Sequence, residues 1–223
     1  MKAYRAVVQL NFQSSLLFSD KAIINKIAQN KQFTNRQFDH QQHILFLVSP
    51  LTNVSAQISE TQAIFQIDKN PHELQILEQS VSFFNNVLDN LSIEELTRIG
   101  LRISWGSEID SKEEGIQLIK NNVLSSIPWQ HFNNGPLGTN VIFHFIEDQV
   151  HFNFRLDSAT AQYVSIDENG SQVSTSHFLE ADLDVYCEGL IKSDSIKDFL
   201  EESYRQGMQK ATFLLEAVKG ASK

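Results

Sequence analysis

Hydrophobic and polar residues alternate through the centre of the chain, in the stretch 97-TRIGLRISWGSE-108. Every second position is apolar, namely Ile99, Leu101, Ile103 and Trp105. Because successive side chains of a β-strand point to opposite faces, this alternation predicts a strand that is buried on one face only. It also places two arginines, Arg98 and Arg102, together on the other face.

The first half of the chain has the periodicity of a strand, a short helix, several more strands and a long helix. Alternation over 3–12 predicts the first strand, and apolar residues at helical spacing over 20–30 predict the short helix. The further strands have β-type composition and turn residues between them, at 33–39, 43–49, 53–59 and 62–68. Asn70 followed by Pro71 predicts the start of the long helix, which ends near Asn90.

The second half repeats the same order of elements. After the central strand come a helix and then β-type segments, at 141–147, 149–157, 160–167 and 176–189, followed by a last helix over about 194–219. We therefore expect an α+β fold in one domain, residues 1–223, made of two strand, helix, antiparallel meander and long-helix halves, about 1–91 and 92–223. TATA-binding-protein-like and helix-grip folds have such a helix across a curved sheet. Since the halves share no evident sequence identity, the repeat is one of pattern only.

Two Ser-x-x-Glu capping boxes lie in the second half. The first, 92-SIEE-95, predicts a short helical turn before the central strand, and the second, 111-SKEE-114, predicts the start of the helix that follows it.

The alternation also gathers charged side chains from three strands on one face of the sheet. Strand 149–157 has its apolar residues on one side, and strand 176–188 has the same arrangement. The polar sides of the three strands carry Arg98, Arg102, Ser104, His151, Asn153, Arg155, Glu180, Asp182, Asp184 and Tyr186, with His144 or His151 beside the charges. We take this polar face as the candidate binding surface.

Three interpretations of the polar face remain open. Its charges form cross-strand ion pairs on a solvated surface, each contributing about 0.2–1 kcal/mol. Alternatively, Arg98, Arg102 and Arg155 offer paired N–H donors to a carboxylate, phosphate or peptide of a ligand or protein. A hard cation bound by Glu180, Asp182 or Asp184 is the third interpretation, but no calcium-loop or zinc-site spacing supports it. We therefore assign no metal and no cofactor.

Composition narrows the classes of partner. The 223 residues carry a formal net charge of −9 and contain no run of lysines and arginines, which argues against nucleic acid. The single cysteine, Cys187, permits no internal disulfide. The N-terminal residues alternate between apolar and polar and lack the continuous apolar block of a secretory signal. The longest apolar runs are far shorter than the roughly 20 residues of a membrane helix. We expect a cytoplasmic protein without a membrane span.

The chain resembles a sporadically distributed family of uncharacterised bacterial and phage proteins. The family has a central R-x-G-L-R-aromatic-x-N strand and a C-terminal D-x-D strand that leads into a final helix. Here 98-RIGLR-102 matches the first motif, and 182-DLDVY-186, followed by the helical pattern over 195–216, matches the second. Ile103 and Trp105 depart from the family's aromatic residue and asparagine. The resemblance implies no established activity, but the sporadic occurrence suggests a mobile-element or antiphage setting.

Known enzyme motifs are not evident, and the remaining signal is an aromatic loop. The chain has no Walker lysine after 135-GPLG-138 and no Gly-x-Ser-x-Gly elbow. Trp129, in 127-IPWQHFNN-134, has the composition of a protein interface or of a pocket lid, although such loops also pack back on the core.

Two functions follow as hypotheses. The first is a non-catalytic module that binds a protein partner or a second copy of itself, through strand edges that a long meander leaves open. The alternative is a small-molecule binder or enzyme that uses a cavity between the curved sheet and a long helix, for which sixteen phenylalanines leave room.

Overall fold

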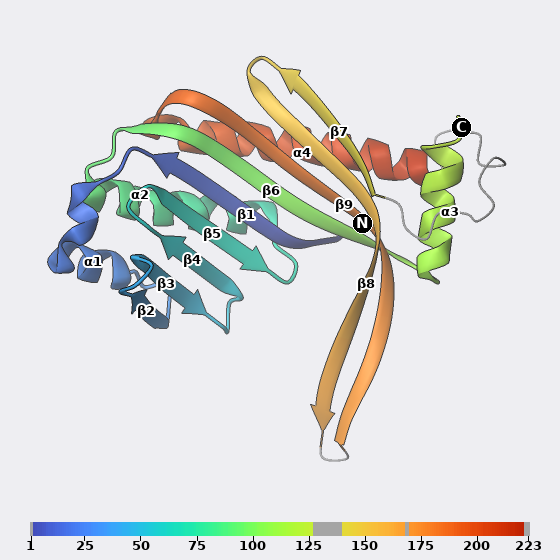
Figure 1. Ribbon diagram of the computed structural model, residues 1–223, viewed down its shortest axis with the longest axis horizontal. Coiled ribbons are helices and arrows are strands. Elements are labelled where there is room, and N and C mark those ends of the chain that lie inside the picture. The colour runs from blue at the N-terminus through green and yellow to red at the C-terminus, as the bar shows by residue number, and fades with distance from the viewer. Residues whose placement is uncertain (1, 127–139, 168–169, 221–223) are drawn as a thin grey trace.

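The protein is built on one antiparallel sheet of nine strands, in the order β2-β3-β4-β5-β1-β6-β9-β8-β7 (Figure 1). The computed structural model describes residues 2–126, 140–167 and 170–220. The strands are β1 (Lys2–Phe12), β2 (Asn35–Asp39), β3 (Ile44–Ser49), β4 (Val54–Ile58), β5 (Gln62–Asp68), β6 (Glu95–Ile109), β7 (Asn140–Glu147), β8 (Val150–Asp167) and β9 (Gly170–Lys192). The principal helices are α1 (Lys21–Ala28), α2 (Ser80–Leu91), α3 (Lys112–Asn122) and α4 (Ile196–Lys219).

The two halves meet at the centre of the sheet, where β1 pairs antiparallel with β6. In each half the last strand of the meander returns to pair with the first strand, so β5 lies beside β1 and β9 lies beside β6. Each half then ends in a long helix, α2 in the first and α4 in the second. The expected α+β class is confirmed, and the elements follow the expected order except that the segments 149–157 and 160–167, expected as two strands, form the single strand β8.

All four principal helices bury side chains in the same hydrophobic core as one face of the sheet. The alternation of apolar and polar residues along β6 decides this face, since its apolar side chains at positions 99, 101, 103 and 105 are at most 2% exposed. Among the described residues the helices cover this face alone, which leaves the other face of the sheet open. We call that second surface the open face.

Aromatic side chains fill the space between the first half of the sheet and α2. Phe65 of β5 stacks at a tilt on Phe83 of α2, with ring centroids 5.3 Å apart, and Phe84 lies 5.1 Å from Phe83. Phe33 meets the same group edge to face, 5.7 Å from Phe83. Such a cluster buries large apolar surfaces and adds favourable ring contacts, so these phenylalanines are packed core.

Two expected helix starts differ from the structure. The 92-SIEE-95 box forms no helical turn, because Ser92 ends α2 in the left-handed conformation (φ 53°) and β6 begins at Glu95, opposite Lys192 of β9. Pairing with β9 therefore prevails over local capping. Asn70 does not cap the next helix either, since it has φ 63° and the side chain of His72 accepts the N–H of Gln75 instead (3.3 Å). This helix contains a π-helical segment, Gln75–Gln79, before α2.

Ser111 caps the start of α3 as expected, while the returning bond of the box goes to the residue before the cap. Ser111 accepts the backbone N–H of Glu114 (3.1 Å), and the Glu114 carboxylate accepts the N–H of Asp110 (2.7 Å). The box therefore fixes where the chain leaves β6 and enters the helix.

Strands β8 and β9 continue beyond the rest of the sheet as a two-stranded ribbon (Figure 1). Strand β7 pairs with β8 only as far as Asp157, and β6 pairs with β9 only from His177 onwards. Among the described residues, Ser158–Asp167 of β8 pairs only with β9, and Gly170–Ser176 of β9 pairs only with β8. We call this part of the hairpin the ribbon.

Gly115 sets how closely α3 lies on β8. A Cβ atom at this position would be 2.5 Å from the hydroxyl of Ser158, whose Oγ donates to the carbonyl of Lys112 (2.9 Å). We expect Gly115→Ala to lower the free energy of unfolding by about 1–3 kcal/mol through overpacking, although alanine favours helix. Urea denaturation measures the change. Gln117→Ala, on the exposed side of α3, is the matched control and should be neutral or slightly stabilising; an equal gain in both variants would contradict the close contact.

Candidate binding surface on the open face

The charged side chains predicted to share one face do share it. Arg98 and Arg102 come from β6, Arg155 from β8, and three acidic residues from β9, the strand between them. The register places Arg102 opposite Asp184, and Ser104 opposite Asp182, which in turn lies opposite Arg155. The period-two pattern of the three strands therefore sorts these groups as expected.

Asp182 is the centre of the cluster. Its side chain is only 7% exposed. Arg102 donates to both carboxylate oxygens, through Nε at 3.0 Å and through Nη2 at 2.5 Å to Oδ2. The hydroxyl of Ser104 donates to Oδ1 at 2.9 Å. A charged carboxylate at this depth is stable because each of its oxygens accepts charge-assisted or hydroxyl hydrogen bonds.

Arg155 links Asp182 to a second carboxylate. Its Nη2 donates to Glu180 at 3.0 Å and lies 3.9 Å from Asp182. Its Nε is buried without a hydrogen-bond partner in the described part of the chain. Tyr4, on β1, interacts with the carboxylate of Glu180, and burial followed by this carboxylate raises the pKa of Tyr4. Tyr4 therefore stays a neutral phenol that ties β1 to the cluster.

Arg98 forms the third part of the cluster, nearer the end of β9. It donates to Asp184 at 3.4 Å and lies 3.8 Å from a carboxylate oxygen of Glu188. Burial raises the pKa of Asp184, and the charges of Arg98 and Arg102 only partly oppose this shift.

A row of stacked planar groups crosses four strands beside these pairs. The ring of His144 on β7 stacks on His151 of β8 at 5.5 Å, and His151 stacks on Tyr186 of β9 at 4.7 Å. The guanidinium of Arg98 covers the other side of the Tyr186 ring, 4.5 Å from its centroid. Gly100 leaves this space, since a Cβ there would be 3.3 Å from Tyr186 and 3.8 Å from the Arg98 guanidinium. The Arg-x-Gly spacing in β6 thus lets the arginine fold over the ring.

The open face ends in a hydrophobic margin at β7, the last strand of the sheet. Ile142 is 65% exposed and Ile146 is 57% exposed, one on either side of His144 along the strand. Their neighbours Phe143 and Phe145 point to the helix side, where they pack partly against the core. Among the described residues no strand pairs with the outer edge of β7.

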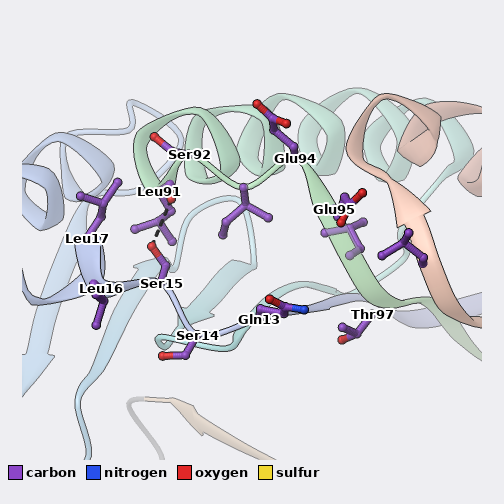
Figure 2. A pocket seen from close by; sticks show the side chains of 13 residues that line it. Gln13, Ser14, Ser15, Leu16, Leu17, Leu91, Ser92, Glu94, Glu95 and Thr97 are labelled. Atoms are coloured by element: carbon purple, nitrogen blue, oxygen red, sulfur yellow. Dashed lines mark hydrogen bonds between the residues drawn. The ribbon is translucent and has the colours of Figure 1, made fainter.

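A pocket of about 580 Å³ lies elsewhere, at the end of the sheet where β1, α2 and β6 approach one another (Figure 2). Ser15 donates to the carbonyl of Leu91 across it (3.1 Å), and the exposed Leu16 borders it. Its lining comprises Gln13–Leu17, Leu91–Thr97 and Leu190. None of the predicted binding residues lines this pocket.

This pocket does not lie between the sheet and a long helix, where the sequence leaves room for a cavity. Between the sheet and α4, the fully buried side chains of Leu183, Phe152, Leu200 and Ala211 belong to the packed core. Gly207 of α4 lies so close to the sheet that a Cβ would be 2.8 Å from Leu183. The described pocket therefore does not lie between the sheet and α4, and the helix packs closely on the sheet around Gly207.

Within the described ranges, no group of three histidine, cysteine or acidic residues is arranged to hold a metal ion. None of the helices in the described part of the chain is long and apolar enough to cross a membrane.

Comparison with known proteins gave no relative on which to base a function. No protein-family model matches the chain, and no curated protein matches it.

The geometry also brings in Tyr4, which the alternation of the three strands does not place on the polar face. The sequence already names His144, Tyr186 and Ser104 for this face, and the structure adds their contacts, which are the stacked row and the hydrogen bond to Asp182. The alternation of side chains along β7 and β9 places His144 and Tyr186 on the open face. Their stacking depends in addition on the register between strands, which the sequence alone does not give. Of the predicted residues, Trp129 lies outside the described residues.

Arg102→Ala tests the ion pair at the centre of the cluster. The variant leaves the buried carboxylate of Asp182 without its main charged partner, so we expect the free energy of unfolding to fall by about 1–3 kcal/mol in urea denaturation. Arg5→Ala is the matched control, because Arg5 pairs with Asp68 on the same face at 3.0 Å with both side chains exposed. Its loss should cost less than about 1 kcal/mol. Equal losses would show that burial of Asp182 adds nothing.

Asp184→Asn tests the effect of burial on Asp184. Since its pKa is raised, the folded protein binds this proton more tightly than the unfolded chain does. This contribution to stability is therefore gained as the pH falls through the raised pKa and is lost as the pH rises. We expect the melting temperature of the wild type, relative to the variant, to increase between about pH 7 and about pH 4. Asp68→Asn controls for the loss of one exposed carboxylate; a difference independent of pH would contradict the raised pKa.

Proposed function

We propose that this chain is a non-catalytic protein-binding module that binds its partner along the outer edge of β7. The observation that carries the proposal is the exposure of Ile142 and Ile146 beside that edge. An open strand edge presents N–H and C=O groups that an added strand completes, while alternate side chains provide specificity. Two exposed isoleucines on one face of β7, four positions apart, supply that second element.

The two edges of the sheet differ in a way that supports the proposal. Edge strand β2 has only five residues, which include Arg36 and Asp39. Short length and charge are devices that protect an edge from unwanted pairing. Edge strand β7 has eight residues, and its only charged residue is the last, Glu147. The chain therefore protects one edge and leaves the other suited to pairing.

The charge distribution on the open face fits a protein surface better than a nucleic-acid surface. The three arginines of the cluster, at positions 98, 102 and 155, contact four carboxylates, at positions 180, 182, 184 and 188. Phosphate binding depends on basic groups that remain free to replace counterions. Paired charges instead form a polar rim beside the hydrophobic margin, which is the usual anatomy of a protein interface.

The alternative, a small-molecule binder or enzyme, draws no support from the cluster. Its arginines and carboxylates satisfy one another, and they stand on a sheet face rather than in the described pocket. A ligand pocket would bring a few polar groups together inside a concave apolar site.

The setting of the module is also a proposal. A cytoplasmic location agrees with the lone Cys187 and with the absence of a membrane-crossing helix among the described residues. A role in a mobile-element or antiphage system depends only on the family resemblance of 98-RIGLR-102 and 182-DLDVY-186.

Quantitative co-purification tests the proposal. The wild-type chain and Ile142→Lys/Ile146→Lys are expressed as tagged baits in the native cell, and the captured proteins are compared by mass spectrometry. We expect proteins enriched by the wild type to fall at least about tenfold with the double variant, because two charges at an open edge oppose strand addition. Leu51→Lys, at a β3–β4 turn residue that is 90% exposed, is the matched control and should retain them.

Thermal unfolding of each bait confirms that the substitutions leave the fold intact, as expected for exposed positions. A partner set that the double variant retains, and that Arg102→Ala alone abolishes at unchanged melting temperature, would place binding on the charged cluster instead of the β7 edge.

A further inference from the structure

The sequence of β7 is symmetric about its middle residue. The segment 142-IFHFI-146 reads identically in both directions, with His144 at its centre. Antiparallel strands run in opposite directions, so a palindromic segment that pairs with its own copy sets every residue opposite an identical one. This symmetry concerns the same strand edge on which the proposed function rests.

We infer that the partner of β7 is β7 of a second copy of this chain, paired antiparallel about a two-fold axis at His144. The axis is perpendicular to the sheet, so the open faces of both copies lie on the same side. Ile142 of one copy then meets Ile146 of the other, and Phe143 meets Phe145. The inference deepens the proposed function, on which it rests, by naming the partner and the register.

The alternation of side chains restricts the possible registers. Residues directly opposite each other in an antiparallel pair point to the same face of the sheet. The axis must therefore pass through a residue, because an axis between two residues would oppose an open-face side chain to a helix-side one. An axis at Ile142 or at Ile146 would set His144 opposite position 140 or 148, both polar. Only the axis at His144 pairs all four apolar residues of the segment with apolar residues.

Exposure and charge agree with this register. Ile142 and Ile146 are the two exposed apolar side chains of the strand, and pairing buries them against each other on the open face. Glu147 lies opposite Val141 of the other copy, and the two Glu147 residues are six positions apart, about 20 Å. Lys210 of α4 already neutralises Glu147 within each copy, with Nζ 2.8 Å from the carboxylate. No like charges therefore meet directly in the pair.

The assembly would join the two sheets into one. Each copy contributes nine strands, and the short, charged β2 strands then form the two ends of the joined sheet, while the β8–β9 ribbons extend from it as before. The stacked row of Arg98, Tyr186, His151 and His144 would end at the axis, where the two His144 side chains face each other. A closed two-fold pair of this kind consumes the open edge and stops further addition.

The first experiment measures the oligomeric state by light scattering coupled to size exclusion. We expect the full chain to be a dimer, Ile142→Lys/Ile146→Lys to be a monomer with an unchanged circular dichroism spectrum, and Leu51→Lys to remain a dimer. A wild-type protein that stays monomeric at high concentration overturns the inference. In that case, capture of another protein that depends on Ile142 and Ile146 would leave the proposed function standing.

The second experiment tests the register by disulfide cross-linking, with Cys187 replaced by serine to remove the native thiol. Two cysteines form a disulfide only when their Cα atoms are within about 7 Å. His144→Cys chains should therefore cross-link to each other under mild oxidation. Ile142→Cys chains should not, because the two copies of position 142 are about 13 Å apart in this register. A mixture of Ile142→Cys and Ile146→Cys chains should cross-link again.

These cross-linking results separate the possible failures. A dimer in which Ile142→Cys cross-links to itself, and His144→Cys does not, overturns the register. A dimer that persists in Ile142→Lys/Ile146→Lys shows that the copies meet at another surface, which overturns the inference, whereas the co-purification result for the same double variant decides whether the proposed function stands.

Discussion

The pairing of β1 with β6 is the constraint on which the rest of this structure depends. It joins the first strand of each half at the middle of the sheet, with Val8 opposite Leu101 and Leu10 opposite Ile99. All four of these side chains face the helices and are buried. Because the register of an antiparallel pair fixes which residues share a face, this contact aligns the apolar sides of both halves and directs α2 and α4 to the same layer. The polar sides are aligned by the same contact, which creates the open face.

The side chains of an open face are ordered by other interactions than those of a hydrophobic core. It gains little from burial, so its order comes from directional contacts between long side chains. Asp182 shows how these contacts combine, since a carboxylate that would be costly to desolvate is held by Arg102, Ser104 and the more distant Arg155. The stacked rings beside Asp182 also order the face, because planar side chains from neighbouring strands pack on one another. The face consequently owes its order to paired charges and stacked rings, and its most exposed apolar side chains among those of β7 are Ile142 and Ile146.

How far the sequence predicts this arrangement depends on whether the signal is local. Alternation along β6, β8 and β9 places Arg98, Arg102, Arg155 and their acidic partners on one face without any knowledge of strand order. The 111-SKEE-114 box is equally local and is confirmed by the structure. The similar 92-SIEE-95 box forms no helical turn, because Glu95 pairs with Lys192 of β9, almost a hundred positions away. The stacking of His144 on His151, and of Arg98 on Tyr186 over Gly100, likewise depends on register between distant strands, as does the filling of the space beneath α4.

The central position of β1 has a consequence for how the chain is made. Ribosomes release β1 long before β6, and during that interval the meander of the first half gives β1 a neighbour on one side only, β5. The nascent intermediate therefore carries a long, apolar strand whose second flank awaits residues still being translated, the kind of species that misassembles with other nascent chains. Emergence of Glu95–Ile109 closes that flank, and the open edge of the growing sheet then passes to β6 until its partner β9 is translated.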